Sequence, residues 1–238
     1  MEKFLSLFTD KIVCISEAER DSAIREHVAR EDKLVLIPNG IDIKAVIDEK
    51  GFDRSEIGVS EDAFVVGMIG RLTSQKSPDI FIRAAKLIHE KISNSFFIIV
   101  GDGEMRNEVE EYAKDNGIPL LVTGWTETPY SYLKVFNIAL LLSRWEGFGL
   151  AIVEYMAAGI NVIATNVDAI PTLIDDMING LLVEVDNPDD VCNKVLFLIE
   201  KPELAKTMKK NAFEKVSKMY DIKRVAEQHV RMFHDMLK

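Results

Sequence analysis

Cysteine, metal-binding clusters and long apolar runs are scarce in this sequence. Its 238 residues include two cysteines and four histidines. Cys14 and Cys192 lie far apart and form no CxxC pair, so neither a disulfide framework nor a zinc site is indicated. No apolar run approaches the roughly 20 residues that a membrane span needs, and the first residues lack the basic start and long apolar core of a signal peptide. We therefore expect a cytoplasmic protein.

Common signals for phosphate and nucleic-acid binding are also lacking. The sequence contains no GxxxxGK[ST] motif, and the turn Gly101-Asp102-Gly103 does not begin a GxGxxG fingerprint, since Met105 and Arg106 follow it. The net charge of -10 argues against general binding to nucleic acids or anionic membranes. A local basic pocket for a phosphorylated small molecule is still compatible with this charge.

From residue 63 onward, apolar strands alternate with amphipathic helices. The expected strands cover residues 64–69, 96–100, 120–122, 138–142, 161–165 and 181–185. The expected helices begin at residue 78 and then cover 104–116, 150–158, 188–199, 202–219 and 222–236. This alternation predicts an α/β fold, a doubly wound parallel sheet with helices on both faces.

The first 42 residues are unusual for the start of a domain. Apolar residues at 4–8 indicate the end of an amphipathic helix, and strands are expected at 11–15 and 34–37. Between them, Ser16 and Glu19 form a capping pattern for a helix that runs to about residue 28. We expect these few elements to be unable to enclose a core of their own.

The stretch 140–165 has the pattern strand, loop, helix, strand. Its loop carries Glu146, and Glu154 follows about one turn into the helix. Backbone N–H groups of residues 147–150 would lie at the start of this helix, where unpaired donors and the helix dipole favour a phosphate. The two glutamates could instead be solvated side chains, but the apolar neighbours of Glu154 favour a position facing a crevice.

Two basic residues, Arg71 and Lys76, follow the first strand of the regular part. Their loop would leave the same edge of the sheet, where two cations could neutralise a diphosphate. Isolated basic residues in loops are usually only solvated. Because Arg71 and Lys76 are expected at the same sheet edge as the helix start at residues 147–150, a diphosphate site is the better interpretation. The glycine turn at 101–103 could allow close approach of a ligand or could be a plain turn.

Together these residues resemble the nucleotide-sugar-binding C-terminal domain of the retaining GT-B glycosyltransferases of the group-one (family four) type. The resemblance rests on four segments. Two are the linker Pro-Asn-Gly-Ile-Asp at 38–42 and the Gly-Asp-Gly turn at 101–103. The other two are Gly70-Arg71-Leu72 with Lys76, and SRWEGFGLAIVEYMAAG at 143–159 with the strand 161–165. It covers most of the chain from about residue 11. It implies a Rossmann-like sheet that forms the C-terminal half of a GT-B fold.

The resemblance also implies roles for single residues. Arg71 and Lys76 would hold the donor diphosphate and stabilise the departing nucleotide, and Glu146 would contact the transferred sugar, so these three are the expected catalytic residues. Glu154 would accept hydrogen bonds from the ribose hydroxyls. The expected donor-binding residues are Gly70, Gly101, Gly103, Gly147, Phe148, Gly149, Leu150 and Glu154. No metal or cofactor is expected, in keeping with the absence of an Asp-x-Asp motif, and the nucleotide-diphosphate sugar is the substrate.

The resemblance divides the chain into three parts. Residues 1–42 would be a remnant of the N-terminal acceptor domain and the linker, residues 43–221 the donor-binding domain, and residues 222–238 a helix crossing back to the acceptor domain. Most of the acceptor domain is then absent, so we expect nucleotide binding without sugar transfer, and self-association through the exposed remnant.

Three functions are compatible with this division. The chain could be a truncated donor half of a glycosyltransferase, or one subunit of a split enzyme whose acceptor domain is a separate chain. It could also be a non-catalytic nucleotide-binding or interaction module, which the retained charged residues disfavour. As part of a full enzyme it could lie at the inner face of a membrane. The sequence does not indicate which nucleotide base, which sugar or which acceptor is used.

One loop departs from the family pattern. Where the family commonly has Gly-Gly before Ile/Val-Pro-Glu, this sequence has Asp168-Ala169-Ile170-Pro171-Thr172. The loop therefore lacks two glycines and one carboxylate, and its conformation and its fit to the donor are open.

Overall fold

A six-stranded parallel sheet forms the centre of the computed structural model, which describes residues 2–238. The strands are β3 (Phe64–Ile69), β4 (Ser95–Val100), β5 (Leu120–Val122), β6 (Ile138–Leu141), β7 (Asn161–Thr165) and β8 (Leu181–Val183). They lie in the order β5-β4-β3-β6-β7-β8, and every neighbouring pair is parallel. The predicted α/β fold with a doubly wound parallel sheet is confirmed.

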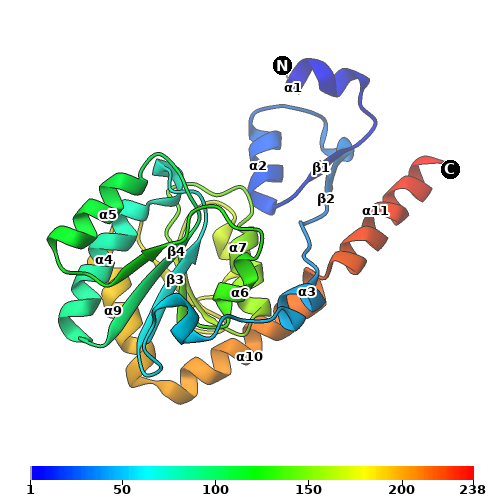
Figure 1. The fold of residues 1–238 in the computed structure, drawn as a ribbon. Coiled ribbons are helices and arrows are strands. Elements are labelled where there is room, and N and C mark those ends of the chain that lie inside the picture. The colour runs from blue at the N-terminus through cyan, green and yellow to red at the C-terminus, as the bar shows by residue number, and fades with distance from the viewer. Residues whose placement is uncertain (1) are drawn as a thin grey trace.

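Helices cover both faces of this sheet (Figure 1). On one face lie α4 (Pro78–Lys91), α5 (Arg106–Asp115) and α9 (Pro188–Glu200), and on the other α3 (Ile43–Asp48), α6 (Pro129–Leu133), α7 (Leu150–Ala157) and α8 (Ile170–Leu173). Because successive strand residues point to opposite faces, Val65 packs in the core on the α7 side and Val66 in the core on the α4 side. Helix α10 (Pro202–Met219) contributes to both cores.

The first residues form a small separate unit beside the C-terminal helix α11 (Ile222–Met236), as Figure 1 shows. Its elements are α1 (Glu2–Leu5), β1 (Ile12–Cys14), α2 (Glu17–Arg25) and β2 (Leu34–Leu36). The two strands form a parallel pair with no further strand in the described part of the chain. This N-terminal unit continues into the linker, where Ile41 donates a backbone hydrogen bond to Tyr220 and accepts one from Ile222, the first residue of α11.

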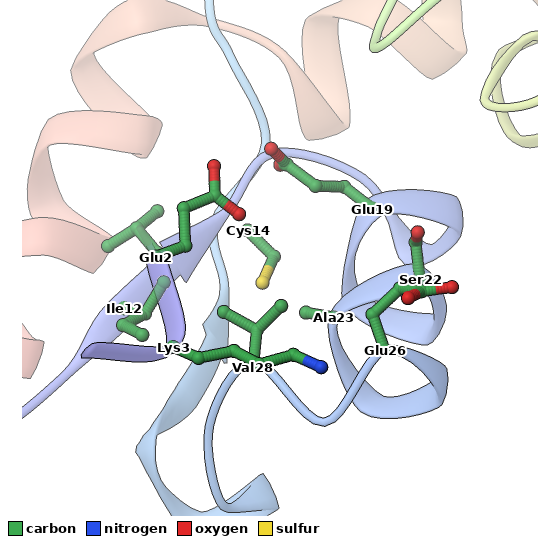
Figure 2. A pocket seen from close by; sticks show the side chains of 10 residues that line it. Glu2, Lys3, Ile12, Cys14, Glu19, Ser22, Ala23, Glu26 and Val28 are labelled. Carbon is green, nitrogen blue, oxygen red and sulfur yellow. The ribbon is translucent and has the colours of Figure 1, made fainter. Parts of the chain in front are cut away.

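A cavity of about 490 Å³ lies inside the N-terminal unit. Figure 2 shows Cys14, Ala23 and Val28 around it, with the carboxylates of Glu19 and Glu26 nearby. None of the residues predicted for nucleotide-sugar binding lines this cavity. The predicted domain limits at residues 42 and 221 stay predictions.

Most predicted elements agree with the structure in type and position. The strands at 64–69, 120–122 and 161–165 and the helices at 202–219 and 222–236 have the predicted limits. Helix α2 ends at Arg25, earlier than predicted, and the next turn contains His27 with a φ of 50°. The helices α3, α6 and α8 were not predicted, because segments of four to six residues are too short to show helical periodicity.

The strand order reverses between β3 and β6. From β3 the chain proceeds through β4 and β5 to one edge, whereas from β6 it proceeds through β7 and β8 to the other. At such a reversal the loops that follow the two central strands diverge and leave a crevice at the carboxyl edge of the sheet. The loops after β3 and β6 carry the three predicted catalytic residues, Arg71, Lys76 and Glu146.

A buried tyrosine of α7 closes the sheet below this crevice. The register pairs Val66 and Gly67 of β3 with Ile138 and Ala139 of β6 and goes no further. Beyond it, the backbone N–H of Ile69 donates a 2.6 Å hydrogen bond to the hydroxyl of Tyr155. The side chain of Tyr155 thus takes the place of a strand partner where β3 and β6 separate.

We expect the substitution Tyr155→Phe to lower the free energy of unfolding by about 1–3 kcal/mol, because it leaves a buried backbone N–H without an acceptor. Chemical denaturation followed by circular dichroism measures this difference. Tyr112→Phe on α5 is the matched control, since the Tyr112 hydroxyl has no hydrogen bond within residues 2–238. Equal stabilities of the two variants would contradict the role given to Tyr155.

Candidate functional site

The predicted residues Lys76 and Glu146 meet across the crevice. Lys76 ends the 3-10 turn Ser74–Lys76 after β3, and Glu146 lies in the loop after β6. Their side chains form an ion pair and are largely buried, with exposed fractions of 17% and 11%. The same carboxylate oxygen of Glu146 accepts a 3.1 Å hydrogen bond from the Ser143 hydroxyl. The structure therefore brings together one predicted catalytic cation and the one predicted catalytic carboxylate.

The loop after Glu146 presents unpaired backbone donors. Gly149 precedes α7 with a φ of 100°, a conformation that glycine adopts without strain. The N–H groups of residues 147–150 have no acceptor within the part of the chain that the structure describes. Phe148 itself is buried and packs edge-on against Tyr220, with ring centroids 5.7 Å apart. The loop is thus anchored through a side chain while its N–H groups remain available to an anion.

The glycines at 101 and 103 pack against the loop that follows β3. A Cβ at Gly101 would lie 2.0 Å from the carbonyl oxygen of Gly70, and one at Gly103 would lie 2.4 Å from the carbonyl oxygen of Leu72. The two loops therefore touch backbone to backbone. This packing explains both glycines, and their predicted role in donor binding stays a prediction.

In the described part of the chain, Arg71 and Glu154 form no hydrogen bond or ion pair with Lys76 or Glu146. Arg71 is exposed on the loop after β3. Glu154 is half-buried on α7, and its Oε1 accepts a 2.9 Å hydrogen bond from the hydroxyl of Tyr130 on α6. Burial raises the pKa of Glu154, and the hydrogen bond from Tyr130 opposes that rise.

Arg144 joins the two loops that carry Lys76 and Glu146. Its guanidinium donates to both carboxylate oxygens of Asp79 on α4, to Asp186 and to the carbonyl of Ser74. The backbone N–H of Arg144 also donates to the carbonyl of Gln75, at 2.9 Å. These contacts fix the relative position of the loops, because a planar guanidinium holds its partners in one geometry.

Sequence reasoning did not single out Arg144 or Tyr130. Arg144 lies inside the block at 143–159, but an arginine in a loop gives no sign of which carboxylates it will meet. Tyr130 belongs to the short helix that was not predicted. Only the tertiary structure places these two side chains next to the predicted residues.

The divergent loop at 168–172 is held against Glu146. Asp168 adopts a φ of 44°, a left-handed conformation that aspartate tolerates better than most residues. Its carboxylate accepts a 2.9 Å hydrogen bond from the backbone N–H of Glu146. Asp168, at the place of one of the two missing glycines, therefore both turns the chain and binds the neighbouring loop.

Other classes of site find no support in the described residues. Between residues 2 and 238, no three His, Cys, Asp or Glu side chains are grouped so that they could hold a metal ion. No helix in the same range is long and apolar enough to cross a membrane.

Comparison with known proteins identifies the family. A family model described as glycosyl transferases group 1 matches residues 49–215. The chain belongs to the group 1 glycosyltransferases. The predicted family is thereby confirmed, and the matched region of this glycosyltransferase chain contains all predicted site residues.

Among its relatives are enzymes of bacterial glycan synthesis. Over its whole length the chain is 30% identical to the UDP-Gal:alpha-D-GlcNAc-diphosphoundecaprenol alpha-1,3-galactosyltransferase of Escherichia coli. It is 26% identical, again over its whole length, to the capsular polysaccharide biosynthesis glycosyltransferase CapM of Staphylococcus aureus. The chain spans 63% and 65% of the lengths of these two proteins.

Solved structures share the fold. HepE of Anabaena, crystallised with UDP and glucose, superposes with a TM-score of 0.87 at 23% identity, over 96% of this chain and 64% of HepE. The C-terminal domain of the group 1 glycosyltransferase LpcC of Francisella tularensis gives a TM-score of 0.68 at 25% identity, and it is matched in full by 77% of this chain. These likenesses agree with the predicted Rossmann-like half of a GT-B fold.

The raised pKa of Glu154 predicts a pH-dependent stability difference. Between the ordinary value of 4.5 and the raised value, the folded state holds a proton that the unfolded state has lost, so stability falls as pH rises through this interval. Glutamine does not titrate. We therefore expect Glu154→Gln to be more stable relative to the wild type at pH 7 than at pH 4.

Thermal unfolding of both proteins at the two pH values measures this difference. Glu111→Gln, at an exposed position of α5, is the control for loss of a surface charge. A Glu154→Gln difference that is the same at pH 4 and pH 7 would show that burial does not disfavour the ionised carboxylate.

Proposed function

We propose that the chain binds a nucleotide-diphosphate sugar, with UDP as the nucleotide, as the donor half of a retaining glycosyltransferase. The observation that carries this proposal is the Lys76–Glu146 pair across the sheet reversal, beside the unpaired N–H groups of residues 147–150. Cation, carboxylate and N–H donors together fit a diphosphate linked to a hydroxyl-rich sugar. The UDP in the HepE crystal supports the choice of nucleotide.

The proposed roles follow from the charges of the side chains. Arg71 and Lys76 bind the diphosphate and stabilise the negative charge on the departing nucleotide, an electrostatic effect that is large in a water-poor crevice. Glu146 accepts hydrogen bonds from the sugar hydroxyls, and Glu154 accepts them from the ribose. The N–H groups at the start of α7 complete the contact with the phosphate. The reaction needs neither a metal nor a cofactor in this proposal.

The acceptor is bound by a second α/β domain, supplied by a longer protein or by a separate chain. The parallel pair β1 and β2 supports this, since so small a parallel sheet normally needs further strands and helices around it. The two relatives are also longer than the part that this chain covers, which leaves room in them for such a second domain. The residues 2–238 alone then bind the nucleotide but transfer no sugar, and the complete enzyme adds a hexose to a glycan or lipid acceptor at the inner face of a membrane.

A non-catalytic nucleotide-binding module is the alternative function. It would keep the binding of UDP but would show no transfer even when the acceptor domain is present. The buried Lys76–Glu146 pair favours the enzyme, because nucleotide binding by itself gives no reason for a carboxylate next to the cation that meets the diphosphate.

Isothermal titration calorimetry with UDP, GDP and ADP tests the donor site. We expect UDP to bind with a Kd in the micromolar to millimolar range, and Lys76→Ala to weaken it about tenfold or more, since the loss of one charge-assisted contact costs about 1.5–3 kcal/mol. Lys91→Ala, at the other end of α4, is the control and should bind like the wild type. Absence of binding to all three nucleotides at millimolar concentration would refute the donor site.

Light scattering tests the exposed surface of the N-terminal unit. Phe4, Leu7 and Phe8 expose 64%, 71% and 78% of their surface, and such a group of apolar side chains normally contacts another protein surface. When residues 1–238 are prepared alone, we expect them to self-associate as their concentration rises, and the double substitution Phe4→Ser with Phe8→Ser to reduce this. Ile178→Ser, at a single exposed apolar residue elsewhere, is the control. A monomer at high concentration would contradict the expectation.

A further inference from the structure

Tyr130 is the one side chain among the described residues that hydrogen-bonds the carboxylate of Glu154. The Tyr130 hydroxyl donates to Oε1 of Glu154 across the gap between α6 and α7, at 2.9 Å. Within residues 2–238, the other oxygen, Oε2, has no hydrogen-bond partner. One half of the carboxylate is therefore fixed by the protein, and the other half remains free to accept.

Helix α6 is held firmly enough to place this hydroxyl. The hydroxyl of Ser131 donates to Glu49 at 2.7 Å, and the Lys134 ammonium donates to the carbonyl of Ile47 at 2.8 Å. The rings of Tyr132 and Phe52 also pack against each other, with centroids 4.7 Å apart and an interplanar angle of 54°. A five-residue helix has little stability of its own, so these contacts with residues 47–52 determine its position.

The surroundings keep Tyr130 a donor and Glu154 an acceptor. Burial and the charge of Glu154 raise the pKa of the Tyr130 hydroxyl, with a smaller contribution from Asp42. The hydrogen bond in turn lowers the pKa of Glu154 against the effect of burial. An ionised carboxylate accepts stronger hydrogen bonds than a protonated one. Tyr130 thus favours the form of Glu154 that can bind hydroxyl groups.

We propose that Tyr130 is a positioning residue for nucleotide recognition, whose hydroxyl fixes Glu154 so that the free carboxylate oxygen receives the ribose hydroxyls. This inference rests on the proposed function, in which Glu154 contacts the ribose. It assigns Tyr130 no contact with the nucleotide itself. The effect of Tyr130 must therefore pass through Glu154 and through the ribose hydroxyls.

Calorimetry with UDP on four proteins tests this dependence: the wild type, Tyr130→Phe, Glu154→Ala and the double variant. We expect Tyr130→Phe to weaken UDP binding about 3- to 10-fold, the effect of one hydrogen bond. In the Glu154→Ala background the same substitution should have no further effect, because coupled residues are non-additive. With 2′,3′-dideoxy-UDP, which lacks both ribose hydroxyls, Tyr130→Phe and the wild type should bind alike.

Two further measurements separate positioning from stability. Tyr132→Phe, on the same helix and without a hydroxyl contact in the described range, is the matched control and should bind UDP like the wild type. Thermal unfolding of every variant shows whether it is folded, and Glu154→Gln replaces Glu154→Ala if the alanine variant is not. A carboxyl carbon NMR titration should show a higher pKa for Glu154 in Tyr130→Phe than in the wild type.

The outcomes distinguish this inference from the proposed function. If Glu154→Ala weakens UDP binding but Tyr130→Phe does not, the role of Tyr130 is refuted while the donor site stands. The role of Tyr130 would also be refuted if Tyr130→Phe lowered the affinity for UDP and for 2′,3′-dideoxy-UDP equally, or if it left the pKa of Glu154 unchanged. If the wild type binds none of UDP, GDP and ADP, the proposed function fails and this inference fails with it.

Discussion

The reversal of strand order between β3 and β6 is the constraint on which the site depends. It sends α4 to one face of the sheet and α7 to the other, so the two loops at the carboxyl edge cannot pack on each other along their whole length. The remaining gap is bridged by side chains, with Tyr155 at the sheet, the Lys76–Glu146 pair above it and Arg144 beside that pair. The crevice is therefore a consequence of topology, and its chemistry is a consequence of which side chains bridge it.

The two basic side chains between these loops, Lys76 and Arg144, are both paired with carboxylates. Lys76 is paired with Glu146, and Arg144 is paired with Asp79 and Asp186. Burying an unpaired charge of either sign is costly, which accounts for the pairing of Lys76 and Arg144 with carboxylates. The pairing holds the ammonium of Lys76 against the carboxylate of Glu146, between the two loops. Arg71 is exposed on the loop after β3 and has no such partner in the described part of the chain.

The sequence predicted the sheet better than it predicted the side-chain contacts. Buried parallel strands are continuous apolar runs. The strand at residues 64–69 and the strands that follow it could therefore be predicted from the sequence alone. The glycines, Lys76 and Glu146 were readable through their positions after these strands and through the family resemblance. Arg144 and Tyr130 were not, because a hydrogen bond between residues that are 24 or 65 positions apart has no local signal. The short helix that carries Tyr130 was missed for the same reason, since tertiary contacts and not its own pattern maintain it.

The loop at residues 168–172 departs from the family's glycine pattern, and a side-chain hydrogen bond holds it against Glu146. A glycine would permit the left-handed turn but could not reach its neighbour. Asp168 has the same backbone conformation and adds a hydrogen bond to the backbone N–H of Glu146. The strain of a positive φ is small for aspartate, and a charge-assisted hydrogen bond to a backbone N–H offsets it. The position of the Glu146 backbone therefore depends in part on the carboxylate of Asp168.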